Sequence, residues 1–165
     1  MADKTLAERL QPSLLDRLTD NNPSVQKESR DDRVIDMRRL REIVQRDLSW
    51  LLNTSNNESW IDPEVYPMAA QSVLNFGIRE VSGEFSSEER AELIRKSIAK
   101  AISSFEPRIR EGSADVEMHL EDVNRETVVS FDIRADMWAE PVPLELYLRS
   151  EVDITTGTVT LERMY

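Results

Sequence analysis

The apolar residues change their spacing at Gly112, and this change constrains the fold more than any other feature of the sequence. Before Gly112 they recur at intervals of three and four, which is the spacing that lines one face of a helix. After Gly112 they alternate with polar residues, which is typical of strands that bury one face. A chain with its helices first and its strands last is expected to form an α+β fold, with a small, mostly antiparallel sheet at the C-terminal end.

Two long helices are predicted before Gly112. The first should end near Asn53, where a run of residues that favour turns begins, and its apolar face consists of Met37, Leu40, Val44, Leu48 and Leu51. The second should begin at Ser86, because Ser86 and Glu89 have the spacing of a capping box, and Pro107 should end it. Its buried face consists of Ala91, Ile94, Ile98, Ala101, Ile102 and Phe105.

Shorter elements complete the prediction. A short helix is expected over residues 13–19, and another over residues 68–76 with Gly77 as its left-handed stop. Alternating rows at 116–120, 129–135, 144–150 and 158–161 predict four strands, with Thr156 and Gly157 in the last turn. We expect a polar N-terminal arm over residues 1–34 and one α+β domain over residues 35–165, because 165 residues fit a single domain.

The charge balance argues against nucleic acid as the main partner. The chain has 32 acidic and 21 basic residues, for a formal net charge of −11, whereas phosphate binding needs a basic face. Six arginines nevertheless lie between Arg30 and Arg46. They could contact an acidic protein partner, or they could form ion pairs on a solvated helix face, and the sequence favours neither.

The cellular location can be inferred from three features that are absent from the sequence. The chain has no cysteine, residues 1–10 are polar, and no apolar run approaches the length of a membrane-spanning helix. We therefore expect a cytoplasmic protein.

Most of the residues that could carry chemistry have an ordinary explanation. His119 is the only histidine and is expected to be an exposed strand residue, since no second imidazole or thiol could share a zinc ion with it. Adjacent acids such as Glu88 and Glu89 are expected at a solvated surface, as are the pairs Asp31-Asp32 and Glu121-Asp122. The four glycines are too far apart for a phosphate-binding loop. No catalytic residue, cofactor or metal ion is predicted.

Glu106, Pro107 and Arg108 form the one constellation that invites a functional interpretation. They lie where the second long helix meets the sheet, and the proline restricts the directions of the two charged side chains. A guanidinium offers a planar fork for bidentate pairing. The alternative is an ordinary helix end, with Arg108 near the negative end of the helix dipole.

Four segments in the same order resemble one family. Residues 46–53 read RDLSWLLN and are similar to the RDLxWLLN segment of the TssE subunits of bacterial type VI secretion systems. Residues 72–77 read SVLNFG, where the family has SVLNYG, and residues 106–108 match its EPR motif. Residues 14–18, LLDRL, also fit. The same family includes the baseplate wedge proteins of phage tails, historically labelled lysozyme-like.

The resemblance implies a structural role. The chain would belong to a baseplate wedge beside TssF and TssG, with TssK nearby, and Glu106, Pro107 and Arg108 would bind the helical core of the wedge. The resemblance also implies that the C-terminal sheet seeds the sheath of TssB and TssC. This agrees with the chemistry of a strand edge, which offers unpaired backbone groups to a partner strand. The strands near 128–137 and 144–152 are candidates for that edge. We further expect the partner groups of Arg108 to lie on another chain.

Two other functions remain open. Peptidoglycan hydrolysis would use Glu106 as the general acid, but a neighbouring arginine opposes the raised pKa that this role needs, and the substrate lies outside the cytoplasm. A regulatory module of the anti-adaptor type, which binds response regulators, would share the α+β plan. The Glu-Pro-Arg match favours the baseplate.

Overall fold

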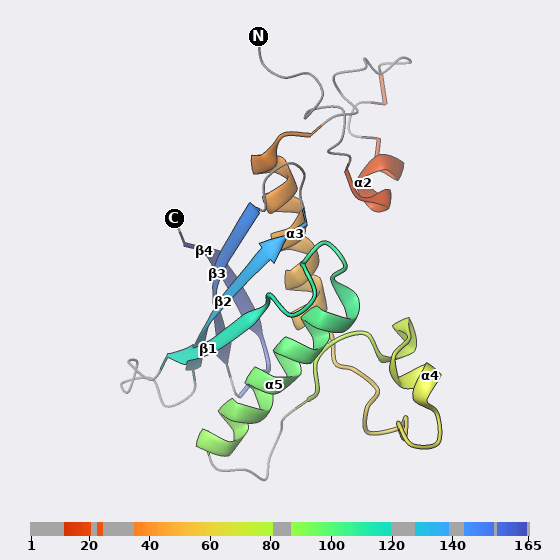
Figure 1. The fold of residues 1–165 in the computed structure, drawn as a ribbon, viewed down its shortest axis with the longest axis vertical. Coiled ribbons are helices and arrows are strands. Elements are labelled where there is room, and N and C mark those ends of the chain that lie inside the picture. Colours follow the sequence, from red (N-terminus) through yellow and green to blue (C-terminus); the bar gives the residue numbers. More distant parts are fainter. Residues whose placement is uncertain are drawn as a thin grey trace.

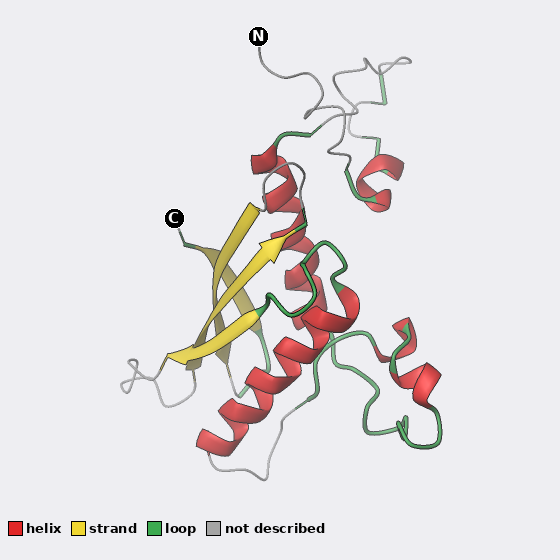
Figure 2. Ribbon diagram, viewed as in Figure 1, coloured by secondary structure: helices red, strands yellow, loops and turns green. Residues whose placement is uncertain are grey.

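The computed structural model describes residues 12–20, 23–24, 35–80, 87–119, 128–138, 144–153 and 155–164. Helices come first and a four-stranded antiparallel sheet comes last, which confirms the predicted α+β class (Figures 1 and 2). The elements are α2 (Leu14–Leu18), α3 (Met37–Leu52), α4 (Pro67–Ala70), the 3₁₀ helix η2 (Val73–Asn75), α5 (Ser87–Phe105), β1 (Asp115–His119), β2 (Val128–Met137), β3 (Leu144–Asp153) and β4 (Val159–Arg163). Residues 12–20 and 23–24 of the predicted N-terminal arm are described and include α2, while the rest of the arm and the capping residue Ser86 lie outside the described residues.

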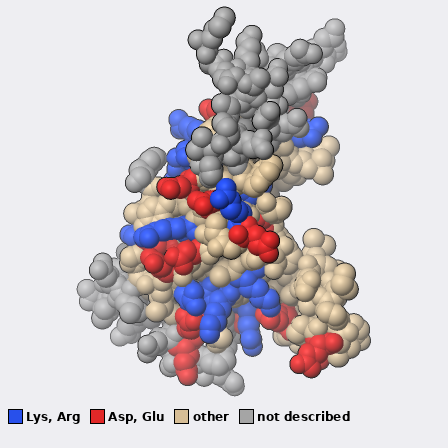
Figure 3. Space-filling view, viewed as in Figure 1, with Lys and Arg blue, Asp and Glu red and all other residues tan. Residues whose placement is uncertain are grey.

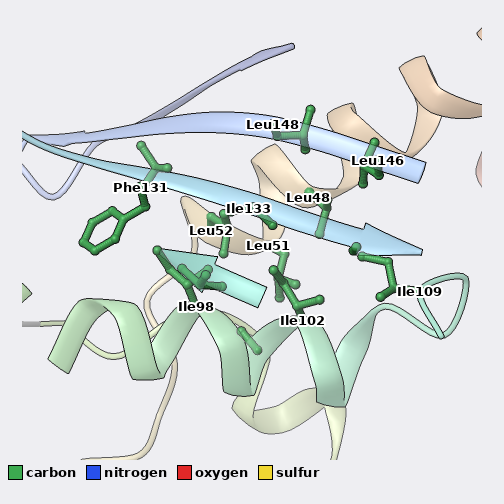
Figure 4. Close-up of a cluster of buried hydrophobic side chains, with 14 of the residues drawn as sticks. Leu48, Leu51, Leu52, Ile98, Ile102, Ile109, Phe131, Ile133, Leu146 and Leu148 are labelled. Atoms are coloured by element: carbon green, nitrogen blue, oxygen red, sulfur yellow. The ribbon is translucent and has the colours of Figure 1, made fainter. Parts of the chain in front are cut away.

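The core lies between the sheet and the two long helices. The strands follow one another in the order β1-β2-β3-β4, and every neighbouring pair is antiparallel. Their inward row meets the apolar faces of α3 and α5 in one cluster (Figure 4). Its fully buried members include Leu48, Leu52, Ile98, Ile102, Phe131, Ile133 and Leu148. Burying each such side chain contributes roughly 1.5–3 kcal/mol, so this contact is the main source of stability.

Helix α3 has the predicted end, and its predicted apolar face is buried except at Met37, which is only partly buried and lies outside the core cluster. Asp36 caps its first turn by accepting a hydrogen bond from the backbone N–H of Arg39 at 2.7 Å. At the other end, the side-chain amide of Asn53 donates to the carbonyl of Ser49 at 2.8 Å. The same amide donates to the carbonyl of Val159, and its oxygen accepts from the Val159 N–H at 2.9 Å. Asn53 therefore ends α3 and fixes β4 beside it.

The helix predicted over residues 68–76 was wrong in its extent. The structure has the four-residue helix α4, then a turn at Ser72, then η2. Ser72 is extended, with φ −93° and ψ 172°, because its hydroxyl donates to the carbonyl of Ala69 and accepts from the N–H of Leu74. Such local side-chain bonds compete with the helical pattern.

Gly77 has the predicted positive φ, 117°, but its role is a close approach between two backbones. A Cβ at this position would lie 2.1 Å from the carbonyl oxygen of Thr54. The next residue, Ile78, donates to that same oxygen at 2.8 Å and accepts from the N–H of Asn56 at 2.9 Å. Only glycine lets the two segments meet in this way.

We expect Gly77→Ala to lower the free energy of unfolding by more than Gly157→Ala. Both glycines have positive φ, but nothing lies within 4 Å of a Cβ added at Gly157. Gly157→Ala should therefore cost about 1–2 kcal/mol for its left-handed backbone alone. Urea unfolding of both variants measures the difference, and equal losses would show that the backbone contact at Thr54 is unimportant.

Candidate functional site

The corner formed by Glu106, Pro107 and Arg108 is held from both sides. Before it, the N–H of Glu106 donates to Ile102, which continues the pattern of α5 by one residue. After it, the N–H of Trp138 donates to the carbonyl of Arg108 at 2.6 Å, and the N–H of Arg110 donates to the carbonyl of Asp136 at 2.8 Å. These two bonds attach the corner to the end of β2. The backbone of the corner is thus fixed between the helix and the sheet.

Glu106 and Arg108 form a bidentate ion pair within the corner. The Glu106 side chain is 4% exposed, and its two oxygens accept from Arg108 Nε at 2.6 Å and from Nη2 at 2.5 Å. Oε1 also accepts from the backbone N–H of Arg108 at 3.1 Å. The planar fork of the guanidinium matches the carboxylate, which is the arrangement that makes such pairs strong.

The pair continues as a chain of alternating charges across three helices. Arg108 Nη2 also donates to Asp47 Oδ2 at 2.8 Å, and Asp47 Oδ1 accepts from Arg46 Nη2 at 2.7 Å. Arg46 in turn donates to Asp16 from Nη1 at 2.6 Å and from Nη2 at 3.0 Å. The chain therefore links the end of α5 to α3, and α3 to the short helix α2.

This chain brings together three of the four segments that carry the family resemblance. Asp16 comes from residues 14–18, Arg46 and Asp47 begin residues 46–53, and Glu106 and Arg108 belong to residues 106–108. The fourth segment is close by, because the ring of Phe76 packs edge-on against Phe105, with 5.4 Å between ring centres. The segments that carry the resemblance are far apart in sequence but lie next to one another in the structure.

The ion pairs shift the pKa values of Arg108 and Asp16. Burial opposes the charge of Arg108, but the hydrogen bonds that it donates to Glu106 and Asp47 outweigh this and raise its pKa above the usual value. The hydrogen bond from Arg46 lowers the pKa of the Asp16 carboxyl from 3.8 to about 2. Both groups are charged at neutral pH.

The expectation that Arg108 finds its partners on another chain was wrong. Its carboxylate partners, Glu106 and Asp47, belong to the same chain, because the turn at Pro107 directs the guanidinium back over α3. The arginine therefore has a structural role. The assignment of Glu106, Pro107 and Arg108 as protein-binding residues stays a prediction.

The corner still presents a surface. Pro107 and Arg110 are exposed, and Trp138 beside them is 66% exposed. Trp50 is half exposed on α3, with the guanidinium of Arg46 stacked 4.8 Å above its ring. A shallow cleft lies between the last turns of α5 and Trp138, lined by Ala99, Ser103, Pro107 and Gly112. Rigid aromatic and guanidinium groups of this kind are enriched in protein interfaces.

The sequence did not reveal a second cluster, which lies on the outer face of the sheet. Asp132 is buried there and accepts hydrogen bonds from Tyr147 at 2.6 Å and from Arg149 at 3.0 Å. His119 Nε2 lies 2.6 Å from the same carboxylate, so the histidine is half exposed and partnered rather than merely exposed. Burial would raise the pKa of Asp132, but these three contacts hold it well below its usual range. The only sequence signal was the position of Asp132 in the polar row.

The other candidate residues form no site in the part of the chain that the structure describes. Glu89 is exposed on α5. The pairs Asp31-Asp32 and Glu121-Asp122 lie outside the described residues. No group of three or more His, Cys, Asp or Glu side chains that could hold a metal ion occurs among the residues with described positions.

The edges of the sheet are the two short strands. The sequence left open which long strand is the edge, and the order β1-β2-β3-β4 places both of them inside. The free side of β4 is partly covered by α3, because Asn53 bonds to both backbone groups of Val159. Gln45 donates to the carbonyl of Leu161 at 3.1 Å. Such coverage is a common protection against unwanted strand pairing.

We expect Arg108→Ala to lower the free energy of unfolding by about 2–4 kcal/mol, because it leaves the buried Glu106 carboxylate without its guanidinium. Arg38→Ala is the matched control, since Arg38 pairs with Glu42 on an exposed face of α3 and such pairs contribute little. Urea unfolding of the isolated chain measures both. If the two variants unfold alike, the corner ion pair does not stabilise the fold.

The contact between Asp16 and Arg46 should weaken in acid. A carboxyl whose pKa falls to about 2 on folding stabilises the folded state above pH 4 and loses this contribution as the pH falls from about 4 to about 2. Asp16→Asn should therefore be less stable than the wild type by on the order of 1–2 kcal/mol at pH 6, and the difference should shrink below pH 4. Unfolding curves at pH 6 and pH 3 test this, and a difference that does not depend on pH would contradict it.

Comparison with known proteins identifies the family. The family model of baseplate wedge protein gp25 matches residues 38–142, which is well over half of the chain and includes α3, α5 and the Glu-Pro-Arg corner. No curated protein and no solved structure matches the chain significantly. In the described part of the chain, no helix has the length and hydropathy needed to cross a bilayer. Together with the ordered motifs that meet at the corner, the match shows that the chain belongs to the family of baseplate wedge proteins.

Proposed function

We propose that this chain is the TssE-type wedge subunit of a type VI secretion baseplate and that it works in the cytoplasm. The observation that carries the proposal is the ion-pair chain that joins Asp16, Arg46, Asp47, Arg108 and Glu106. Four of these residues lie within the region that the family model matches. A family of structural baseplate proteins and a site built from ion pairs both support a structural role rather than catalysis.

The proposed contact with TssF and TssG lies at the corner. The internal pair of Glu106 and Arg108 fixes the turn, and the turn presents Pro107 and Trp138 to the partner. Trp138 is a large side chain with little conformational freedom, which is the type of residue that dominates binding energy in many interfaces. Under this proposal Glu106 and Arg108 act mainly by holding the binding surface in shape, with TssK nearby in the wedge.

The proposed contact with the sheath subunits TssB and TssC uses an edge of the sheet. On β4, the side chains of Asn53 and Gln45 already bond to outward backbone groups. Strand β1 is the other edge, and its end at Met118 and His119 is partly exposed. We therefore assign the pairing edge to that end of β1, where a partner strand would meet less competition.

The enzyme alternative receives no support from the corner. Both carboxylate oxygens of Glu106 accept hydrogen bonds from Arg108, so neither is directed at a substrate. A general acid of a glycosidase also needs a second carboxylate across a cleft. The regulatory alternative is disfavoured by the family match.

The proposal is tested by expressing this chain together with TssF and TssG of the same organism and measuring co-elution by size exclusion. The wild type should co-elute, and Trp138→Ala should weaken the complex at least about tenfold while the isolated variant unfolds like the wild type. Arg108→Ala should also weaken the complex, but this variant is less stable on its own. Trp138→Ala is therefore the cleaner test of docking.

Lys96→Ala is the control, because Lys96 is exposed on α5 and pairs only weakly, at 3.4 Å, with Glu92. It should leave co-elution unchanged. A wild-type chain that never co-elutes with TssF and TssG would refute the assignment to the wedge. If Trp138→Ala still co-elutes with TssF and TssG, the assignment to the wedge stands, but the corner is not the docking site.

A further inference from the structure

Exposed apolar side chains gather in one loop, residues 57–76, which we name the docking loop. Among the described residues, eleven large apolar side chains are exposed, and six of them lie between Trp60 and Leu74. Trp60 is 86% exposed, Met68 81% and Val73 79%. The other three are Val65, Tyr66 and Leu74. Single exposed apolar residues are ordinary, but six of them on one short loop indicate an interaction surface.

The docking loop has a defined structure although its apolar side chains face outward. Its two ends are joined by the backbone bonds between Thr54, Asn56 and Ile78. Inside it, the buried side chain of Asn75 accepts from the N–H of Asn57 at 3.0 Å and donates to the carbonyl of Ala70 at 2.9 Å. These polar contacts fix the backbone above the base of the loop, and the exposed side chains therefore need little ordering when they bind.

The fold itself does not use these side chains. Of the docking loop, only Phe76 at its base packs against the core cluster. The loop protrudes from the domain around α4, on the far side of α5 from the sheet (Figure 1). Figure 3 shows it as a largely uncharged surface with acidic residues at its tip.

The charge of the docking loop indicates the chemistry of its partner. Residues 57–76 contain Glu58, Asp62 and Glu64 but neither lysine nor arginine. Glu58 is paired with Lys100 of α5 at 2.8 Å, which leaves the acids at 62 and 64 beside the apolar side chains. An acidic border opposes a nucleic acid or an anionic membrane. It also opposes a symmetric pair of these loops, since like charges would face each other.

We propose that the docking loop is a preformed knob that inserts into an apolar groove bordered by lysine and arginine on a neighbouring protein subunit of the wedge. The inference rests on the proposed function but concerns a second surface, separate from the Glu-Pro-Arg corner. The contact of Phe76 with Phe105 connects the base of the loop to the end of α5, next to that corner. Two surfaces on one frame would hold a partner at two points and so fix its orientation.

The test compares Met68→Ser/Val73→Ser with Leu18→Ser, using the full chain and the co-expressed TssF–TssG pair as the probe. Leu18 is 74% exposed on α2, outside the docking loop, and serves as the matched control. The double variant should weaken co-elution at least about tenfold, Leu18→Ser should not, and the thermal midpoints of both isolated chains should stay close to that of the wild type. Asp62→Asn/Glu64→Gln should slow association at low salt and have little effect at high salt.

The outcomes separate this inference from the proposed function. If the wild type fails to co-elute, both are refuted. If the wild type co-elutes and Met68→Ser/Val73→Ser co-elutes equally well, the inference alone is refuted. Light scattering of the isolated wild type that shows a dimer, lost in the double variant, would make a second copy the occupant of the loop and would also refute the inference. An equal loss with Leu18→Ser would remove the loop as the specific site.

Discussion

The guanidinium of Arg108 lies between two carboxylates, Glu106 and Asp47, that are 59 positions apart in the sequence, and the arrangement of the helices depends on this contact. A buried carboxylate is costly unless a cation and hydrogen bonds accompany it. Glu106 receives both from Arg108, and the second arm of the same guanidinium joins the end of α5 to α3. Arg46 then extends the network to α2. The apolar core sets how closely the helices approach, and the ion pairs specify which turns of α3 and α5 lie together.

A buried carboxylate also joins separate elements on the outer face of the sheet. Asp132 is buried on β2 and is held by Arg149 and Tyr147 of β3 and by His119 of β1. These contacts join three strands through one carboxylate. A shift of one residue in either pairing would turn these side chains to the other face of the sheet. Buried acids in this protein thus appear where separate elements must be aligned.

The sequence predicted the regular elements well because their apolar residues repeat. The spacing in α3 and α5 and the alternation in β1 to β4 gave the fold class and the ends of most elements to within a few residues. The interval 68–76 failed because the bonds of one hydroxyl, that of Ser72, decide its conformation. The Glu-Pro-Arg motif at 106–108 was also singled out from the sequence, but the contact of Arg108 with Asp47 was not predicted. Asp47 is 61 residues from Arg108, and no local pattern reports a contact at that distance.

The close approach of Gly77 to Thr54 makes the docking loop separable from the rest of the chain. Because backbone bonds join its ends, residues 57–76 form a closed excursion whose length has little effect on the path from α3 to α5. The entropic cost of closing such a loop grows only slowly with its length. Insertions or replacements between Asn56 and Gly77 would therefore change the free energy of unfolding little. Selection could therefore alter the side chains on this loop, and with them the choice of neighbour, while the core and the ion-pair network remain unchanged.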